Sequence, residues 1–380
     1  MKQFKLKGKD IFDGERLLGP GKVLTTSADG VITEITDYHP GDEVQELDGI
    51  LCPGFVNTHC HLELSHMKGV IAEKTGLPAF LTQVMQSRNA DDHLIRTAMA
   101  AAEQAMWESG IAAVGDISNS TVSLTQKQQQ RLYYHTFVEC MGFVDAGATA
   151  RYNYSMEVLR AFQAANGPFH QSSIVPHAPY SVSKTLFGML AETPDNTPFS
   201  IHNQECAAEN ELYTAKTGDF LQFYQQFGID ISSFSAPGTN SLEAYLPVFS
   251  RNKILLVHNT YSYAADIRFV QQQPVEAWWC LCPQANLYIE NRLPDIQLFR
   301  QSGCNITLGT DSLASNHQLS VWDEIKTIRA HYPDIPLEEM LRWATANGAR
   351  ALGIQDRYGS FRPGTTPGIV LINHNSKRII

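Results

Sequence analysis

The segment ILCPGFVNTHCH, residues 50–61, is an apolar run that ends in two histidines separated by one residue. On a β-strand, side chains two positions apart point to the same face. His59 and His61 can therefore reach one metal ion, although an isolated His-x-His pair is more often structural. The segment predicts a buried strand at residues 50–59 with a polar cluster at its carboxyl end.

Seven further apolar runs alternate with stretches that have a helical pattern. The runs lie at residues 112–117, 133–139, 173–177, 199–202, 254–258, 277–282 and 305–310. Between the first two runs of the series, residues 96–109 are Ala-rich and precede Gly110, as is typical of a helix and its end. Eight alternating strand–helix units predict an α/β fold, a (β/α)8 TIM-type barrel.

The two ends of the chain have a different pattern. A hairpin is predicted at residues 23–26 and 31–35 around Asp29-Gly30, and a further strand at residues 368–373. Neither end can bury a sheet face alone. We therefore predict a composite β-sandwich of residues 1–50 plus 358–380 beside a barrel at residues 51–357.

Composition excludes several classes of protein. The formal net charge is −10 and no Lys/Arg-rich run occurs, so no nucleic-acid partner is expected. The seven cysteines form no Cys-x-x-Cys pair, which favours free thiols in a reducing compartment. No run of 18 apolar residues and no apolar N-terminal signal occur, so we expect a cytoplasmic protein without a membrane partner.

Polar residues end several of the other predicted strands. His202, with Glu205 three positions later, ends the fifth, His258 ends the sixth, and Asp311 follows the eighth. Each alone could be a core histidine or a helix-capping aspartate. A barrel brings these strand ends to one mouth. Imidazoles with one carboxylate then predict a site for Zn²⁺, or alternatively Fe²⁺.

Several segments, in their order and spacing, resemble motifs of the amidohydrolase superfamily over essentially the whole chain. They are GFVNTHCHLELS, HNQE, VHNTY, CPQANLYI and LGTDSLASN, while VPHAPYSVS resembles the cytosine deaminase, chlorohydrolase and adenosylhomocysteine deaminase branch. The resemblance implies that His59, His61, His202 and Asp311 bind one divalent ion. It implies a single ion because the fourth strand carries His177 and no lysine to bridge two.

The resemblance also implies roles in a hydrolytic deamination. Asp311 is expected to accept a proton from the attacking water, Glu205 to protonate the ring nitrogen, and His258 to stabilise the tetrahedral centre. His177 is expected to contact the substrate. Glu63 is expected to meet ribose hydroxyls, or alternatively to form a salt bridge.

The predicted function is therefore deamination of an amino-substituted purine nucleoside or related heterocycle, with aminodeoxyfutalosine as the preferred substrate. Arg88, Tyr180 and Asn316 are further candidates for contact with this small molecule, and self-association into a homo-oligomer stays open. Alternatives are a chlorohydrolase or cyclic amide hydrolase on the same site, an inactive binding protein, and an isomerase that uses His and Glu without a metal.

Overall fold

The computed structural model describes residues 3–165 and 167–380. Its eight central strands form two four-stranded parallel sheets. One sheet, in the order β10-β9-β8-β7, contains β7 (Phe55–Cys60), β8 (Ile111–Ser118), β9 (Tyr133–Cys140) and β10 (His170–Pro176). The other contains β11 (Phe199–Asn203), β12 (Lys253–His258), β13 (Glu276–Leu281) and β14 (Ile306–Leu308) in chain order. The predicted α/β class with parallel strands is confirmed.

The edge strands of the two sheets contact each other at their carboxyl ends. The His202 N–H of β11 donates to the carbonyl of His177, the residue after β10, at 2.9 Å, and the Thr310 N–H donates to the His59 carbonyl at 2.9 Å. Cys60 also forms a parallel bridge with Asp311. The ends of β7, β10, β11 and β14 therefore lie close together.

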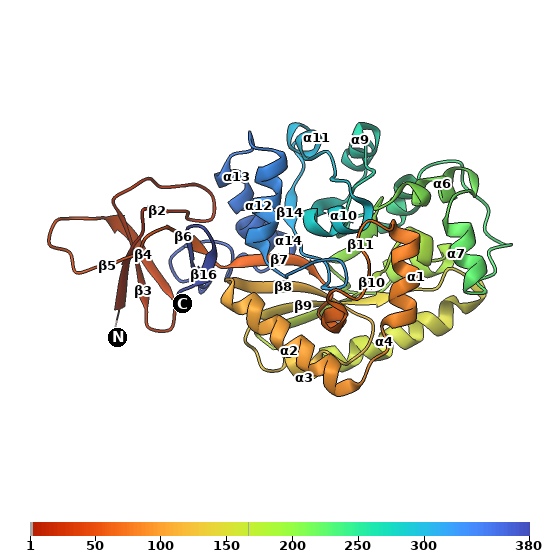
Figure 1. The fold of residues 1–380 in the computed structure, drawn as a ribbon, viewed down its shortest axis with the longest axis horizontal. Helices are drawn as coiled ribbons and strands as arrows, with labels where there is room; N and C mark the ends of the chain where they lie inside the picture. The colour runs from red at the N-terminus through yellow and green to blue at the C-terminus, as the bar shows by residue number, and fades with distance from the viewer. Residues whose placement is uncertain (1–2, 166) are drawn as a thin grey trace.

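Helices lie on both sides of these strands, with α2, α3 and α4 below and α12 to α14 above in the view of Figure 1. The α-helices are α1 (Leu77–Ser87), α2 (Asp92–Glu108), α3 (Leu124–Lys127), α4 (Ala148–Ala164), α5 (Lys184–Ala191), α6 (Ala207–Ala215), α7 (Phe220–Gln226), α8 (Ser241–Tyr245), α9 (Ala264–Gln272), α10 (Pro283–Glu290), α11 (Ile296–Gln301), α12 (Val321–His331), α13 (Leu337–Arg342) and α14 (Gly348–Ala351). Shorter helical segments are η1 (Leu62–Met67), η2 (Asp145–Gly147), η3 (Pro179–Ser181), η4 (Leu246–Phe249) and η5 (Trp343–Asn347). None of the helices in the described residues is long and apolar enough to cross a membrane.

Helix α2 begins four residues before the predicted start at residue 96. The Asp91 side chain accepts a hydrogen bond from the His93 N–H at 2.9 Å and so caps the helix. An aspartate at this position satisfies one of the backbone N–H groups that have no partner inside the helix. The Asp91-Asp92 pair was the signal for this earlier start.

Asp91→Ala is expected to lower the free energy of unfolding by about 1 kcal/mol, because the first turn of α2 loses its cap. The measurement is the urea midpoint, with Asp91→Asn as the control, since an asparagine side chain still accepts the bond. Equal midpoints for the wild type and Asp91→Ala would show that the cap does not limit stability.

The prediction of one strand at residues 50–59 is wrong, because the chain changes sheets at Gly54. Residues before it form β6 (Ile50–Pro53), which pairs with strands from the chain ends, and residues after it form β7. A Cβ atom at Gly54 would meet the Pro367 carbonyl oxygen and lie 2.6 Å from the Ala112 Cβ atom. Glycine is therefore the residue that lets this crossing pack closely.

Two small sheets occupy the end of the molecule at which both termini lie (Figure 1). One, in the order β4-β3-β1-β5, contains β1 (Gln3–Lys7), β3 (Lys22–Ser27), β4 (Ile32–Asp37) and β5 (Gln45–Glu46), and includes the predicted hairpin. The other, in the order β16-β15-β6-β2, contains β2 (Asp10–Ile11), β6, β15 (Ile369–Ile372) and β16 (Ser376–Arg378). Strand β15 pairs antiparallel with β6, so this sheet is built from both ends of the chain.

Candidate active site

Four side chains converge where the two parallel sheets meet. The His61 Nε2 atom lies 3.2 Å from the Nε2 atoms of both His59 and His202. The Asp311 Oδ1 atom lies 3.4 Å from the His61 Nε2 atom and 3.6 Å from the His59 Nε2 atom. All four side chains are buried. The structure therefore brings together the four residues predicted to bind metal.

These distances fit a tetrahedral metal ion. A zinc ion with nitrogen and oxygen donors at ~2.0–2.2 Å places its donors ~3.3–3.6 Å apart. The orientation of His202 also fits, because its Nδ1 atom lies 2.8 Å from the His177 carbonyl oxygen. With the Nδ1–H donating there, the Nε2 lone pair faces the other donors, as a coordinating imidazole requires.

The charge states suit a cation as well. Burial lowers the pKa of His61 to about 3 and that of His202 well below its usual range. Burial alone would raise the pKa of Asp311, but the neighbouring His59, His61 and His258 side chains lower it well below its usual range. Neutral imidazoles and an ionised carboxylate are the forms that coordinate metal ions. His59 differs from the other two histidines, because the Asp311 carboxylate outweighs the effect of burial and raises its pKa.

His258 and Glu205 lie beside this cluster. The His258 Nε2 atom is 3.5 Å from the Glu205 Oε1 atom, and the His258 ring stacks on that of His202 with centroids 5.5 Å apart. Burial, together with the Asp311, Glu290 and Glu209 carboxylates, raises the pKa of Glu205 well above its usual range. A raised pKa favours the protonated carboxyl group, the form that a general acid needs.

The backbone is strained at the strand ends that carry these groups. Gln204, His258, Asn259 and Asp311 have φ angles of 44°, 74°, 60° and 55°. This left-handed region costs a residue other than glycine roughly 1–2 kcal/mol. Such strain concentrates at functional sites, where the surrounding structure holds it in place. Here the Asn203 side chain donates to the Asn259 side chain at 2.9 Å and links the ends of β11 and β12.

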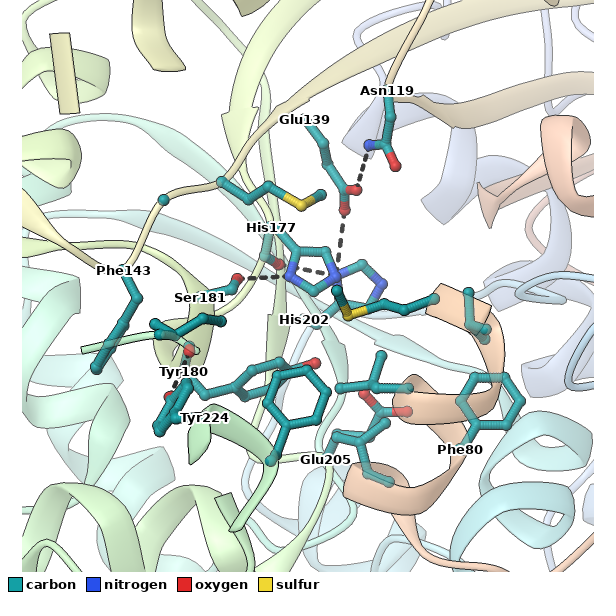
Figure 2. A pocket seen from close by; sticks show the side chains of 18 of the residues that line it. Phe80, Asn119, Glu139, Phe143, His177, Tyr180, Ser181, His202, Glu205 and Tyr224 are labelled. Carbon is teal, nitrogen blue, oxygen red and sulfur yellow. Dashed lines mark hydrogen bonds and ion pairs between the residues drawn. The ribbon is translucent and has the colours of Figure 1, made fainter. Parts of the chain in front are cut away.

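A cavity of about 700 Å³ opens over the cluster. His61, His202, Glu205, His258 and Asp311 form part of its wall. Figure 2 shows His202 and Glu205 among other wall side chains, including Phe80, Phe143, Tyr180 and Tyr224. Most other wall residues are apolar or aromatic and come from α1, α7, α10, η3 and neighbouring loops: Leu77, Phe80, Leu81, Val84, Phe143, Tyr180, Phe223, Tyr224, Ile229 and Ile289. The volume lies in the range of sites for small molecules.

The other predicted contact residues divide into two groups. His177, Arg88 and Tyr180 line the cavity, and the His177 Nδ1 atom lies 2.6 Å from the Ser181 Oγ atom. Glu63 and Asn316 are not among the wall residues. The Asn316 amide instead donates to the Thr310 carbonyl and to Glu324, both at 2.9 Å.

The placement of Glu63 follows from where the strand ends. The chain turns into η1 directly after His61, so the alternation that joins His59 and His61 does not extend to residue 63. The Glu63 side chain is buried and accepts a hydrogen bond from the Asn119 N–H at 3.1 Å. It therefore lies behind the wall residue Asn119.

One wall residue, Glu139, was missed by the sequence analysis. It lies near the end of β9, is buried, and has its Oε1 atom 3.5 Å from the His202 Nδ1 atom. Burial raises the pKa of Glu139 to about 7. Its position at the end of the run at residues 133–139 was the available signal, since other polar residues of the site also end strands.

The chain is similar in sequence and in structure to several known proteins. The chain is 27% identical to the adenosine deaminase of Helicobacter pylori, over 86% of this chain and 82% of that protein. The crystal structure of Helicobacter pylori aminofutalosine deaminase with methylthio-coformycin has a TM-score of 0.83 at 23% identity, covering 98% of this chain and 93% of that one. An adenosine deaminase from Xanthomonas campestris with bound zinc has a TM-score of 0.76 at 21% identity, covering 97% of this chain and 84% of that one.

The two structural matches share the fold at low sequence identity. The sequence model of the amidohydrolase family matches residues 50–379, which include all the residues of the candidate active site. This match shows that the chain belongs to the amidohydrolase family.

Proposed function

We propose that this protein is a metal-dependent deaminase of purine nucleosides. The observation that carries the proposal is the buried Glu205 carboxyl group beside four converging metal donors at a cavity of about 700 Å³. Membership of the amidohydrolase family and the similarity to a deaminase are consistent with an enzyme that hydrolyses carbon–nitrogen bonds.

His59, His61, His202 and Asp311 would hold one divalent ion, with zinc favoured over iron. The three imidazoles and the carboxylate are donors that zinc prefers, and the Xanthomonas campestris neighbour contains zinc. A bound ion of this kind would lower the pKa of a water molecule from ~15.7 to ~7.

The side chains around the proposed metal ion would then transfer protons. Asp311 would accept the proton of the attacking water, and the Ser315 hydroxyl, which donates to its Oδ2 atom at 2.5 Å, would keep the carboxylate in place. Glu205 would donate its proton to the ring nitrogen next to the amino-bearing carbon, and a proton would then reach the departing ammonia. His258, whose Nε2 atom lies 3.5 Å from the Glu205 Oε1 atom, would stabilise the oxygen of the tetrahedral centre.

Within this class we propose aminodeoxyfutalosine as the preferred substrate. The similarity to the Helicobacter pylori aminofutalosine deaminase over nearly the whole chain supports this choice. The apolar wall formed by α1 and α7 supports it too, because it offers room for a large group attached to the nucleoside.

The same proposal extends to the architecture. We propose that the two parallel sheets close into a (β/α)8 barrel at residues 51–357, supported by the bonds from Thr310 to His59 and from His202 to His177. The end strands, residues 1–50 plus 358–380, would form a composite β-sandwich beside it. A buried cluster that includes Leu6, Ile32, Phe361 and Ile369 supports this packing.

A coupled ammonia assay tests the proposed function. Zinc-loaded protein should release ammonia from aminodeoxyfutalosine faster than from adenosine, S-adenosylhomocysteine, guanine or cytosine. Release from adenosine alone would retain the deaminase class and change the substrate. Absence of ammonia from every compound, with chloride released from a chlorinated triazine, would favour a chlorohydrolase instead.

A further inference from the structure

Glu139 presents one carboxylate oxygen without a hydrogen-bond partner at the cavity wall. The residue is 5% exposed, and its Oε2 atom accepts a hydrogen bond from the Asn119 side-chain amide at 2.8 Å. No hydrogen bond reaches its Oε1 atom from the residues that the structure describes. Although the His202 Nδ1 atom is 3.5 Å away, it lies closer to the His177 carbonyl oxygen, at 2.8 Å.

A buried acceptor of this kind is costly to leave unpaired, so a bound ligand is expected to supply a donor. The surroundings favour a neutral donor. Arg88 lines the same wall and would repel a cationic group, while Glu139 itself would repel an anion. A hydroxyl group donates a hydrogen bond without bringing a further charge into the site.

Asn119 and Glu63 hold the carboxylate in place. Glu63 Oε1 accepts the Asn119 N–H at 3.1 Å and lies 3.7 Å from the Arg88 guanidinium. The Asn119 side chain then reaches Glu139. The chain of contacts from Glu63 through Asn119 thus fixes the Glu139 carboxylate at the cavity wall, with its second oxygen on the side of His202.

Glu139 and Glu205 lie on opposite sides of the His177 and His202 rings in Figure 2. A substrate whose ring nitrogen meets Glu205 would extend its other end towards Glu139. We infer that Glu139 is a specificity residue that accepts a hydrogen bond from a sugar hydroxyl of the substrate, with Glu63 acting only as a positioning residue. This inference rests on the proposed nucleoside deaminase function.

The test compares adenosine, 2′-deoxyadenosine and 3′-deoxyadenosine on wild-type protein, Glu139→Ala and Glu139→Gln. Glu139→Ala should lower kcat/KM for adenosine by ~10- to 100-fold, the scale of a hydrogen bond to a charged group, mostly through KM. It should change kcat/KM for at least one deoxynucleoside by less than ~3-fold, because the hydroxyl partner is already missing. Glu139→Gln, which retains an acceptor, should fall between these values, and Glu157→Ala on the exposed face of α4 serves as the control.

Equal losses on all three nucleosides would overturn the inference, as would a fall in metal content that traced the effect to His202. Failure of the proposed function has a different signature, in which the wild-type protein releases ammonia from none of the three. Calorimetric binding of the same nucleosides then decides the inference. Binding that depends on the hydroxyl and on Glu139 supports it, whereas no binding, or binding independent of the hydroxyl, contradicts it.

Discussion

His59→Ala is expected to abolish metal binding and turnover together. The His59 Nε2 atom lies within 3.6 Å of both the His61 and Asp311 donor atoms, so its loss opens one corner of the proposed tetrahedron. Residues that merely orient a ligand cost ~10–100-fold in metal affinity when changed, and removing a ligand should cost at least ~100-fold. Metal analysis should give about one equivalent of zinc for the wild type and very little for the variant, with activity lost in proportion.

His258→Ala is the matched control, because it removes another buried histidine of the same cluster. A second arrangement is geometrically available, since donor atoms of His59, His258 and Asp311 also lie within 4.8 Å of one another. If the proposed ligands are right, His258→Ala keeps its zinc and loses turnover. Loss of zinc from His258→Ala would assign His258 to the metal, and two tightly bound ions per wild-type chain would overturn the single-metal assignment.

Glu205→Gln is expected to lower kcat by at least ~10²-fold while KM, metal content and thermal stability stay close to wild type. Glutamine has nearly the same shape, so the cavity wall is preserved, but its amide cannot deliver the proton. The loss should appear in kcat more than in KM because proton donation matters in the transition state and little in the ground state. Steady-state kinetics with the ammonia assay provide the measurement.

Glu290→Gln is the control for electrostatic effects on Glu205. The Glu290 carboxylate contributes to the raised pKa of Glu205 and is not among the residues that line the cavity. Near-normal turnover is expected, since the Glu205 proton remains. Normal turnover in Glu205→Gln itself would show that Glu205 is a structural neighbour of the metal site, and the deaminase proposal would lose its main support.

Much of the fold was predictable because the sequences of buried parallel strands are short apolar runs. Seven of the eight predicted runs coincide with single parallel strands to within a few residues. The first run failed because it serves two sheets, and periodicity carries no sign of a change of partner. Gly54 marks the crossing, but its role depends on contacts with Ala112 and Pro367 that are distant in sequence.

The candidate site was predictable where a residue type suggests its chemistry and a strand end fixes its place. His61, His202, Glu205, His258 and Asp311 line one cavity, and the His59 Nε2 atom lies 3.2 Å from that of His61. Glu63 and Glu139 show the limit of this reasoning. The strand alternation that would have pointed Glu63 into the cavity ends where the chain enters η1. The position of the Glu139 carboxylate depends on its hydrogen bond from Asn119, a residue of another segment.

The pairing of β6 with β15 also constrains how the protein is made. Strand β6, at residues 50–53, is synthesised early, yet its antiparallel partner lies at residues 369–372. Chains are translated from the N-terminus at ~5–20 residues per second, so β6 waits tens of seconds without this neighbour. An uncovered apolar strand is a site for pairing with other chains. Ribosome-bound nascent chains should therefore remain aggregation-prone and protease-sensitive near residue 50 until the last strands emerge.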